Sequence, residues 1–506
     1  MEKSNKEFLE NIIKWYKISK NQEVYLLSCE DNFEKNLKQE GIKIIKEDKN
    51  KYKDDSNCKK FDYIIIYGFE KFLNLDLKVL IENNLKDEGK IIIIGLNDYA
   101  INNWSKYKKE DNNCGILKLE NKTQNSQIRI IKSKLEECNV NNINTFYVFP
   151  NYENAELIMN EKLDIKDSYI EKYIPDLKEG EIKVFNEQKV IKLIIKNNKQ
   201  MLEFFTNAYF IEASKKDIDN DIMYVSYNNV RKPKYRLITI IKEDVVEKLP
   251  ENEEAVEHIN NIKDNIKKFN SKIELLDYEE NGKICSKLVK NEKTLDEIIS
   301  EKYENINVVA DMLNDFKKIL MIDAVEYNDN IVKNLPNEIK KYKDLLVDLH
   351  YLENAFWDMI PKNCFYINNK YVFFDQEWKE KYLPVEFILY RSIVNSYELI
   401  RHININDLYE KMKIEKYIDL FKKLDYELRE KIIDKNIYNN IYKNKEIKAI
   451  DNLINENMIY VNNFENQSNY IKKIEKALED VRHDNNEKQK YIEYLEKNQR
   501  KFFKRK

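Results

Sequence analysis

The stretch from Trp357 to Trp378 reads WDMIPKNCFYINNKYVFFDQEW and decides how the C-terminal half of the chain is interpreted. Asp358 and Asn363 lie five positions apart, and a second aspartate, Asp375, follows a short apolar segment. A hydroxyl that attacks a γ-phosphate needs a carboxylate to orient it and accept its proton, and Mg²⁺ binds carboxylate and amide oxygens. The pattern therefore predicts a phosphoryl-transfer site with Asp358 as the base and Asn363 and Asp375 as metal ligands.

The residues between the two aspartates predict a β-hairpin. Phe365–Ile367 and Lys370–Phe374 are strand-like, and the pair Asn368-Asn369 between them is a two-residue turn. Such a hairpin would bring Asp375 to a strand end that faces the loop carrying Asp358. The alternative is an ordinary surface loop with two acids, since 35% of the chain is charged.

Length and charge limit the classes of protein to which this chain can belong. A chain of 506 residues predicts two or three domains, and a hydrophobic content of 42% is enough for packed cores. The net charge is −3, from 87 basic and 90 acidic residues, which argues against a nucleic-acid partner bound by bulk electrostatics.

Cysteine usage and hydropathy exclude further classes of protein. The six cysteines form no CxxC pair and the four histidines are dispersed, so neither a zinc site nor a disulfide framework is indicated. The N-terminus has no apolar signal segment, and no apolar run reaches 18 residues. We expect a cytoplasmic protein without a membrane span.

Residues 1–150 alternate between apolar strands and amphipathic helices. Strands are predicted at Val24–Leu27, Ile42–Ile45, Phe61–Tyr67, Lys90–Ile94, Ile128–Ile131 and Thr145–Phe149. Continuous apolar strands separated by helices are typical of a parallel sheet that is covered on both faces. Residues 151–215 are interpreted as a connecting region.

The pattern changes to antiparallel strands from about residue 216. Three short strands, a long helix at Glu251–Phe269 and a hairpin across Asn281-Gly282 fill residues 216–292, and helices dominate residues 293–465. This order resembles the small lobe, hinge and helical large lobe of a protein kinase.

The kinase resemblance assigns nucleotide contacts to the small lobe. Lys248 occupies the third-strand position where a lysine contacts the nucleotide phosphates, and Glu254 or Glu257 on the next helix would hold it by an ion pair. No glycine lies between Asn207 and Gly282, so Arg231 and Lys232 would replace the backbone amides of a glycine-rich loop. The alternatives are that Lys248 is one lysine of a solvated face and that nucleotide does not bind.

The tail, residues 466–506, carries a heptad seam with a polar middle. Its positions are Ile471, Ile474, Leu478, Val481, Asn485, Lys488, Ile492 and Leu495. A coiled coil that makes a homodimer and a single helix docked on the large lobe both fit this pattern.

Several runs resemble a bacterial family of S-adenosylmethionine-dependent methyltransferase-like proteins. They are Phe61–Glu70, Leu85–Asn97, Phe146–Tyr152, Phe205–Ile211, Arg231–Arg236, Glu247–His258 and Asp375–Trp378. Members of that family pair a class I methyltransferase-like domain with a kinase-like, aminoglycoside-phosphotransferase-like domain beside surface-polysaccharide genes. The resemblance implies a surface or flagellar glycan as acceptor and other glycan-modifying enzymes as partners.

The cofactor motif of the first domain departs from that family. A glycine-rich turn should follow the first strand, whereas this chain has Ser28–Phe33 without a glycine. Glu47 or Asp48 could bind the ribose hydroxyls of S-adenosylmethionine, but Glu30 and Asp31 would repel its carboxylate. A degenerate domain kept as a scaffold is the favoured interpretation.

The expected fold is α/β plus α+β: a Rossmann-like methyltransferase-type parallel sheet, a bilobal kinase-like domain and a C-terminal helical tail. The expected function is an ATP- and Mg²⁺-dependent transferase of glycan modification. The alternatives are a methyltransferase that uses S-adenosylmethionine and a non-catalytic scaffold of a glycan-modifying complex.

Overall fold

The structure is a computed structural model of mixed α/β class with a large sheet and many helices. It describes residues 11–39, 41–47, 59–108, 113–114, 127–165, 167–170, 181–183, 185–269, 272–335, 342–396, 399, 402–436 and scattered positions between 472 and 493. The chain divides into two compact units. One contains Met1–Glu181 and Phe185–Ile441, and the other contains Ile182–Val184 and Tyr442–Lys506.

Four parallel strands form one end of a 12-stranded sheet in the first unit, in the order β2–β1–β3–β4. They are β1 (Glu23–Ser28), β2 (Lys43–Glu47), β3 (Phe61–Tyr67) and β4 (Leu85–Leu96), linked in part by helices α2 (Asp31–Gln39) and α3 (Leu77–Asn84). The run Ile64–Ile66 is fully buried, as expected for a strand covered on both faces. Asp76 caps α3 by accepting hydrogen bonds from the backbone N–H groups of Lys78 and Val79. The sequence predicted all four strands.

The sheet continues without a break through the region predicted to be a connection. Beyond β4 come β10 (Ala208–Ser214), β7 (Asn142–Phe149), β8 (Leu157–Asn160) and β11 (Tyr224–Tyr227). β10 is antiparallel to both β4 and β7. Residues 151–215 therefore contribute interior strands that join the N-terminal sheet to the strands after residue 216.

One predicted strand is wrong. Residues 128–131 begin helix α5 (Ile128–Glu137), which buries Ile128, Ile131 and Leu135. These three positions are spaced by three and four residues, so they fall on one face of a helix. A window of four residues, three of them isoleucine, was too short to distinguish this helical period from a strand.

The strands after residue 216 follow the predicted order. β11 is succeeded by β12 (Leu237–Ile241), β13 (Val245–Pro250), helix α9 (Val256–Lys268), the two-residue strand β14 (Glu274–Leu275), β15 (Asp277–Glu280) and β16 (Lys283–Lys287). The predicted turn joins β15 to β16, because Asn281 and Gly282 both have positive φ, at 49° and 83°. Two such residues are what a tight hairpin turn with mirror-image geometry requires.

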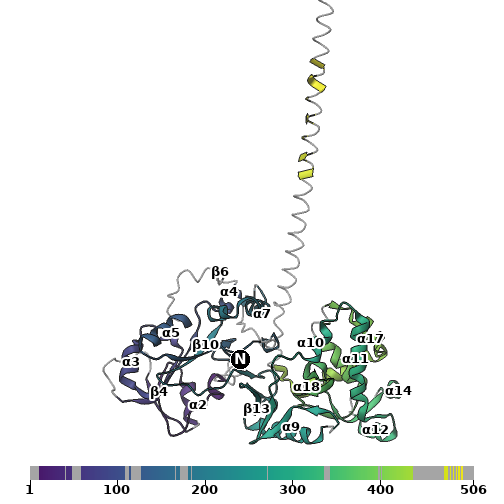
Figure 1. The fold of residues 1–506 in the computed structure, drawn as a ribbon, viewed down its shortest axis with the longest axis horizontal. Helices are drawn as coiled ribbons and strands as arrows, with labels where there is room; N and C mark the ends of the chain where they lie inside the picture. Colours follow the sequence, from purple (N-terminus) through teal and green to yellow (C-terminus); the bar gives the residue numbers. More distant parts are fainter. Residues whose placement is uncertain are drawn as a thin grey trace, which may run out of the picture. The chain divides into compact units, whose positions relative to one another are not determined.

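Helices dominate the remainder of the first unit (Figure 1). A buried apolar cluster lies among them. The main helices are α10 (Leu295–Ser300), α11 (Ile306–Leu320), α15 (Val385–Val394), α17 (Ile405–Lys411) and α18 (Ile418–Ile432). α10 begins with a capping box in which Thr294 and Glu297 exchange side-chain and backbone hydrogen bonds. Every residue from Val385 to Ile393 in α15 is buried, so this helix is the centre of the core.

The second unit contains the predicted tail. Its described positions between residues 472 and 493 are helical and exposed, including Ile492 at 48% exposure. Most of the predicted seam, namely Ile471, Ile474, Leu478, Val481, Asn485 and Leu495, lies outside the described residues. The homodimer stays a prediction. No helix among the described residues is long and apolar enough to cross a membrane.

Candidate functional site

The hairpin predicted from Phe365 to Phe374 forms, and Asp375 follows it directly. β19 (Cys364–Ile367) pairs with β20 (Lys370–Phe373) across Asn368 and Asn369, whose φ values are 52° and 61°. Asp375 follows with φ of 61°, which is a left-handed conformation that a residue with a side chain rarely adopts. Such strain persists only where the surrounding structure imposes it, and it is concentrated at functional sites.

Two cations neutralise the acids at the end of this hairpin. The ammonium group of Lys248, on β13, contacts the carboxylates of both Asp375 and Glu377. Arg231 binds the other carboxylate oxygen of Glu377 at 2.7 Å. Lys248 and Glu377 have side-chain exposures of 12% and 6%, whereas the Asp375 side chain is 41% exposed. The open face of the cluster is therefore the one that Asp375 occupies.

The charges in the cluster determine its protonation. Burial raises the pKa of Glu377, but Arg231 and Lys248 outweigh burial and hold that pKa well below its ordinary value. Burial lowers the pKa of Lys248, and the two carboxylates outweigh it and raise the pKa above its ordinary value. Both side chains are thus charged at neutral pH, as a paired buried cluster requires.

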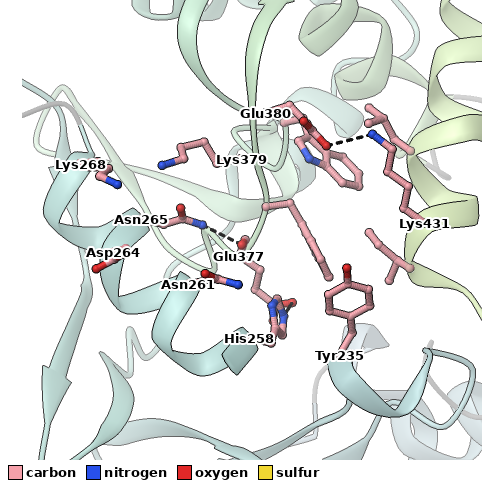
Figure 2. A pocket seen from close by; sticks show the side chains of 14 residues that line it. Tyr235, His258, Asn261, Asp264, Asn265, Lys268, Glu377, Lys379, Glu380 and Lys431 are labelled. Atoms are coloured by element: carbon pink, nitrogen blue, oxygen red, sulfur yellow. Dashed lines mark hydrogen bonds and ion pairs between the residues drawn. The ribbon is translucent and has the colours of Figure 1, made fainter. Parts of the chain in front are cut away.

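Glu377 also anchors the cluster to α9. Asn265 Nδ2 donates a hydrogen bond of 2.8 Å to the backbone carbonyl of Glu377 (Figure 2). His258 Nε2 lies 3.8 Å from the Glu377 carboxylate, which is too far for a hydrogen bond, and its ring stacks on Trp378 with centroids 4.5 Å apart. Contacts with α9 therefore fix the residues that follow Asp375.

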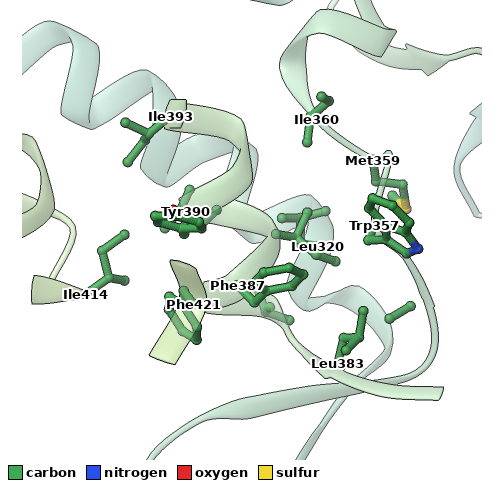
Figure 3. Close-up of a cluster of buried hydrophobic side chains, with 14 of the residues drawn as sticks. Leu320, Trp357, Met359, Ile360, Leu383, Phe387, Tyr390, Ile393, Ile414 and Phe421 are labelled. Carbon is green, nitrogen blue, oxygen red and sulfur yellow. The ribbon is translucent and has the colours of Figure 1, made fainter. Parts of the chain in front are cut away.

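Asp358 lies in the turn after β18 (His350–Phe356), on the wall of the apolar core. Its neighbours Trp357, Met359 and Ile360 are each about 5% exposed and belong to that core (Figure 3). Arg391, on α15, positions this turn: its Nε donates to the Trp357 carbonyl at 3.0 Å, and its Nη2 lies 3.6 Å from Asp358 Oδ1.

The environment of Asp358 favours its neutral form. Burial raises the pKa of Asp358 to about 7; Arg391 opposes the rise, and the charges of Asp375 and Glu377 add to it. The ideal pKa of a general base lies near the working pH. A carboxyl with these properties can accept a proton from a hydroxyl and release it again at neutral pH.

For the phosphoryl transfer that the sequence predicts, with Asp358 as the base, this pKa gives an expected pH dependence. The base must be ionised to accept a proton, so kcat/KM for the acceptor should rise with pH and reach half of its plateau near pH 7. The measurement is initial-rate ADP formation between pH 5.5 and 8.5 at saturating nucleotide. A profile that is flat over this range would exclude the titration of Asp358 from the rate.

Backbone contacts join the turn at Asp358 to the segment of Asp375. Asn363 Nδ2 and Gln376 Nε2 both donate to the Asp358 carbonyl, at 3.1 and 3.2 Å. The Gln376 backbone N–H donates to the buried carboxylate of Asp277 at 3.1 Å. Burial raises the pKa of Asp277. These bonds hold Asp358, Asn363 and Asp375, three sequence-predicted residues, in one region.

Hard oxygen donors for Mg²⁺ are present in that region, on Asp375 and Asn363. Among the described residues, no three His, Cys, Asp or Glu side chains are grouped so that they could hold a metal ion. Mg²⁺ usually binds through one or two carboxylates and completes its shell with waters and substrate phosphates. The donor set fits that mode of binding.

The partner predicted for Lys248 differs in the structure. Glu257 and Glu254 are exposed, and Lys248 contacts Asp375 and Glu377 instead. The side chain from the first turn of α9 that approaches the Glu377 carboxylate is His258, one position after Glu257. Helix phase explains the difference, because His258, Ile259 and Ile262 form the buried face of α9 and Glu257 lies beside it.

The loop predicted to cover the phosphates is bound to protein groups. Arg231 contacts Glu377, and its guanidinium lies 5.3 Å from the Trp378 ring. Lys232 Nζ donates to the carbonyls of Glu430 and Lys431, at 2.9 and 3.0 Å. These carbonyls are at the C-terminal end of α18, where the helix dipole stabilises a positive charge. Any phosphate contact by Arg231 or Lys232 would require that these bonds break.

The residues predicted to bind S-adenosylmethionine lie at the other end of the sheet. Glu47, at the end of β2, accepts a hydrogen bond of 2.8 Å from the Tyr25 hydroxyl, and Asp48 lies outside the described residues. In the turn after β1, Glu30 forms an ion pair of 2.7 Å with Lys71. The Phe33 ring stacks on Tyr67 beside this turn, with centroids 4.2 Å apart.

Sequence reasoning missed Arg391, Asp425 and Asp277. Arg391 contacts Asp425 of α18, and both side chains are nearly buried. One signal existed, since Arg391 is the only basic residue in the apolar helix α15, and a buried arginine requires a partner. Nothing in the sequence marked Asp277 as part of the site, because a single acidic residue in a short polar strand is common.

Comparisons with known proteins complete the description of the site. No protein-family model and no curated protein matches this chain. The chain is similar to the solved streptomycin–ATP–APH(2″)-IIa ternary complex, with 15% identity, coverage of 39% of this chain and 87% of that chain, and a TM-score of 0.22. It is also similar to the GDP complex of wild-type aminoglycoside 2′-phosphotransferase-IIIa, with 11% identity, coverage of 44% and 89%, and a TM-score of 0.21.

A third similar structure is PKMT2 from Rickettsia typhi in complex with AdoHcy. The identity is 12%, the coverage is 83% of this chain and 94% of that chain, and the TM-score is 0.16. All three TM-scores are far below 0.5, so the proposals that follow rest on the geometry of this chain.

Proposed function

We propose that this chain is a kinase-like phosphotransferase that transfers the γ-phosphoryl group of ATP to a hydroxyl of a small molecule or glycan. The observation that supports the proposal is the meeting of Asp358, in a turn, and Asp375, at a hairpin end, with Lys248, on a strand more than a hundred residues earlier in the chain. A buried carboxyl with a raised pKa beside a cation-bound carboxylate is the arrangement expected of a base and a metal ligand.

The proposed reaction uses each side chain in one role. The acceptor oxygen attacks the γ-phosphorus while its proton passes to Asp358, and the bond between the γ-phosphorus and the bridging oxygen breaks to release ADP. Lys248 would contact the nucleotide phosphates. Asp375 and Asn363 would hold Mg²⁺. When it is bound, this ion would neutralise the negative charge of the phosphates. Arg391 keeps the turn of Asp358 in place.

The test of this function is an acceptor screen. Purified full-length protein is incubated with Mg²⁺ and γ-labelled ATP and with sugars, aminoglycosides and nucleotide-linked sugars in turn. Transfer of label to at least one acceptor, above the hydrolysis in buffer, is expected. Absence of transfer to every acceptor, together with absence of ATP hydrolysis, would contradict catalysis by this site.

The glycan acceptor and the glycan-modifying partners are carried over from the family resemblance alone. For the N-terminal sheet, we infer a scaffold rather than a methyl-transfer site. The turn after β1 lacks glycine, and Glu30 and its ion pair with Lys71 occupy it, so its residues do not fit a carboxylate-bearing cofactor such as S-adenosylmethionine. No chemical step is derived through that cofactor.

A non-catalytic assembly factor is the second candidate, favoured by the ion pairs of Lys248 and Arg231. These ion pairs neutralise the carboxylates of Asp375 and Glu377 when no nucleotide or metal is bound, as they would in a cluster with a purely structural role. The two candidates differ in nucleotide binding. A ligand that binds only the native state raises the melting temperature, so MgATP should stabilise a phosphotransferase and leave a scaffold unchanged.

A further inference from the structure

A cavity of about 290 Å³ lies on the α9 side of the acidic cluster. Residues from α9, the segment around Trp378 and the end of α18 enclose it (Figure 2). The proposed reaction uses none of its space, because Asp358, Asn363, Asp375 and Lys248 are absent from its lining.

Aromatic rings form one wall of this cavity. The Tyr235 and Trp378 rings meet edge to face with centroids 5.2 Å apart, and Trp378 also stacks on His258 at 4.5 Å. Trp357 lies behind Trp378 at 6.0 Å. The hydroxyl of Tyr235 points into the cavity (Figure 2). A planar apolar group would find offset or edge-to-face partners on this wall.

Two lysine side chains, Lys268 and Lys379, lie on the side of the cavity away from Tyr235 (Figure 2). Lys431 lies on the other side and is paired with Glu380 at 3.2 Å. Lys268, on α9, and Lys379, at the start of β21 (Lys379–Pro384), lie beside each other at the rim, and neither has an ion-pair partner in the part of the chain that the structure describes (Figure 2). Burial and the neighbouring Lys268 lower the pKa of Lys379, and the charge of Asp264, which also lines the cavity, only partly opposes them. Two adjacent ammonium groups repel each other, and an anion between them would remove that repulsion.

We propose that this cavity is a second ligand site, which binds a small aromatic anion with its phosphate or carboxylate on Lys268 and Lys379 and its ring among Tyr235, His258 and Trp378. The site is separate from the nucleotide site but touches it, since Glu377 lines the cavity and binds Lys248. Asn265, also in the lining, holds the Glu377 backbone at 2.8 Å. The proposal does not require that the chain transfers phosphate.

Phenyl phosphate is the probe, titrated into the full-length protein and followed by calorimetry and by intrinsic tryptophan fluorescence, to which Trp357 and Trp378 of the cavity contribute. Saturable binding is expected. Phenol and inorganic phosphate, which carry only the ring or only the anion, should each bind more weakly, and benzoate distinguishes a carboxylate from a phosphate preference. The double variant K268Q/K379Q should weaken binding by about tenfold or more, the value of a lost charge-assisted hydrogen bond.

Two matched variants make the result decisive. K267Q changes an exposed lysine of the same helix that does not line the cavity, and it should bind as the unmodified protein does. K268R/K379R keeps both charges and should retain binding. The proposal would be overturned if no saturable binding occurred at millimolar phenyl phosphate or if binding survived in K268Q/K379Q. Binding that is kept in K268Q/K379Q but lost in Lys248→Met would place the ligand at Lys248 instead.

Discussion

Asp358→Asn is expected to lower the rate of phosphoryl transfer by about 10²–10⁴-fold, the usual contribution of a positioned general base. The amide has the size of the carboxyl but cannot accept the hydroxyl proton. Binding of MgATP should change little, because Lys248 and Asp375 are untouched. The measurement is kcat for the best acceptor of the screen, with nucleotide affinity measured in parallel.

The same substitution should raise stability above neutral pH. The folded pKa of Asp358, about 7, exceeds its ordinary value of 3.8, so the folded state binds the proton more tightly than the unfolded state. Stability is then lost as pH rises from 3.8 towards 7, and an uncharged amide avoids that loss. The melting temperature of the variant should exceed that of the unmodified protein at pH 8 and approach it at pH 4.

A control separates this effect from a general charge effect. Asp315→Asn changes an exposed aspartate of α11 whose ion pair, among the residues that the structure describes, is with Lys318 at the surface. It should leave both the rate and the melting temperature unchanged. An Asp358→Asn enzyme with full activity would remove Asp358 from the reaction.

Lys248→Met is expected to destabilise the fold by about 3–5 kcal/mol, the usual result of removing one partner of a buried ion pair. Its loss leaves the Glu377 carboxylate, 6% exposed, with Arg231 as its remaining cation, and leaves Asp375 without an ion-pair partner among the described residues. The measurement is the free energy of unfolding in urea, followed by tryptophan fluorescence. MgATP affinity should fall in the same variant.

A second substitution tests whether the loss comes from the uncompensated charge. The double variant Lys248→Met with Glu377→Gln removes one unpaired carboxylate and should recover part of the lost stability. Lys290→Met is the surface control, because its ion pair with Asp244 is exposed and should contribute less than about 1 kcal/mol. Equal losses in Lys248→Met and Lys290→Met would show that the buried cluster has no special role in stability.

Local signals in the sequence predicted most of the elements that carry the site. Asn368-Asn369 and Asn281-Gly282 predicted two hairpin turns, because few residues tolerate the positive φ values that such turns need. The continuous apolar run Phe61–Tyr67 predicted a buried parallel strand. The order of the strands and the helix after residue 216 predicted that Lys248 lies on a strand. Its contact with Asp375 agrees with the prediction that both residues belong to one site.

The remainder depended on contacts that no local pattern specifies. Helix phase placed His258, rather than Glu257, toward Glu377. The pairing of Arg231 with Glu377 joins residues 146 positions apart, and nothing near Arg231 in the sequence identifies its partner. The interior strands β8 and β10 were missed as parts of the large sheet because strand order depends on long-range pairing.

The most direct test of the central claim is a calorimetric titration of the full-length protein with MgATP, repeated with Lys248→Met and with S-adenosylmethionine. We expect saturable binding of one MgATP per chain, a large loss of affinity in Lys248→Met, and no heat from S-adenosylmethionine up to millimolar concentration. Absence of MgATP binding, or MgATP binding that is unaffected by Lys248→Met, would contradict a nucleotide site formed by Lys248, Asp375 and Asp358.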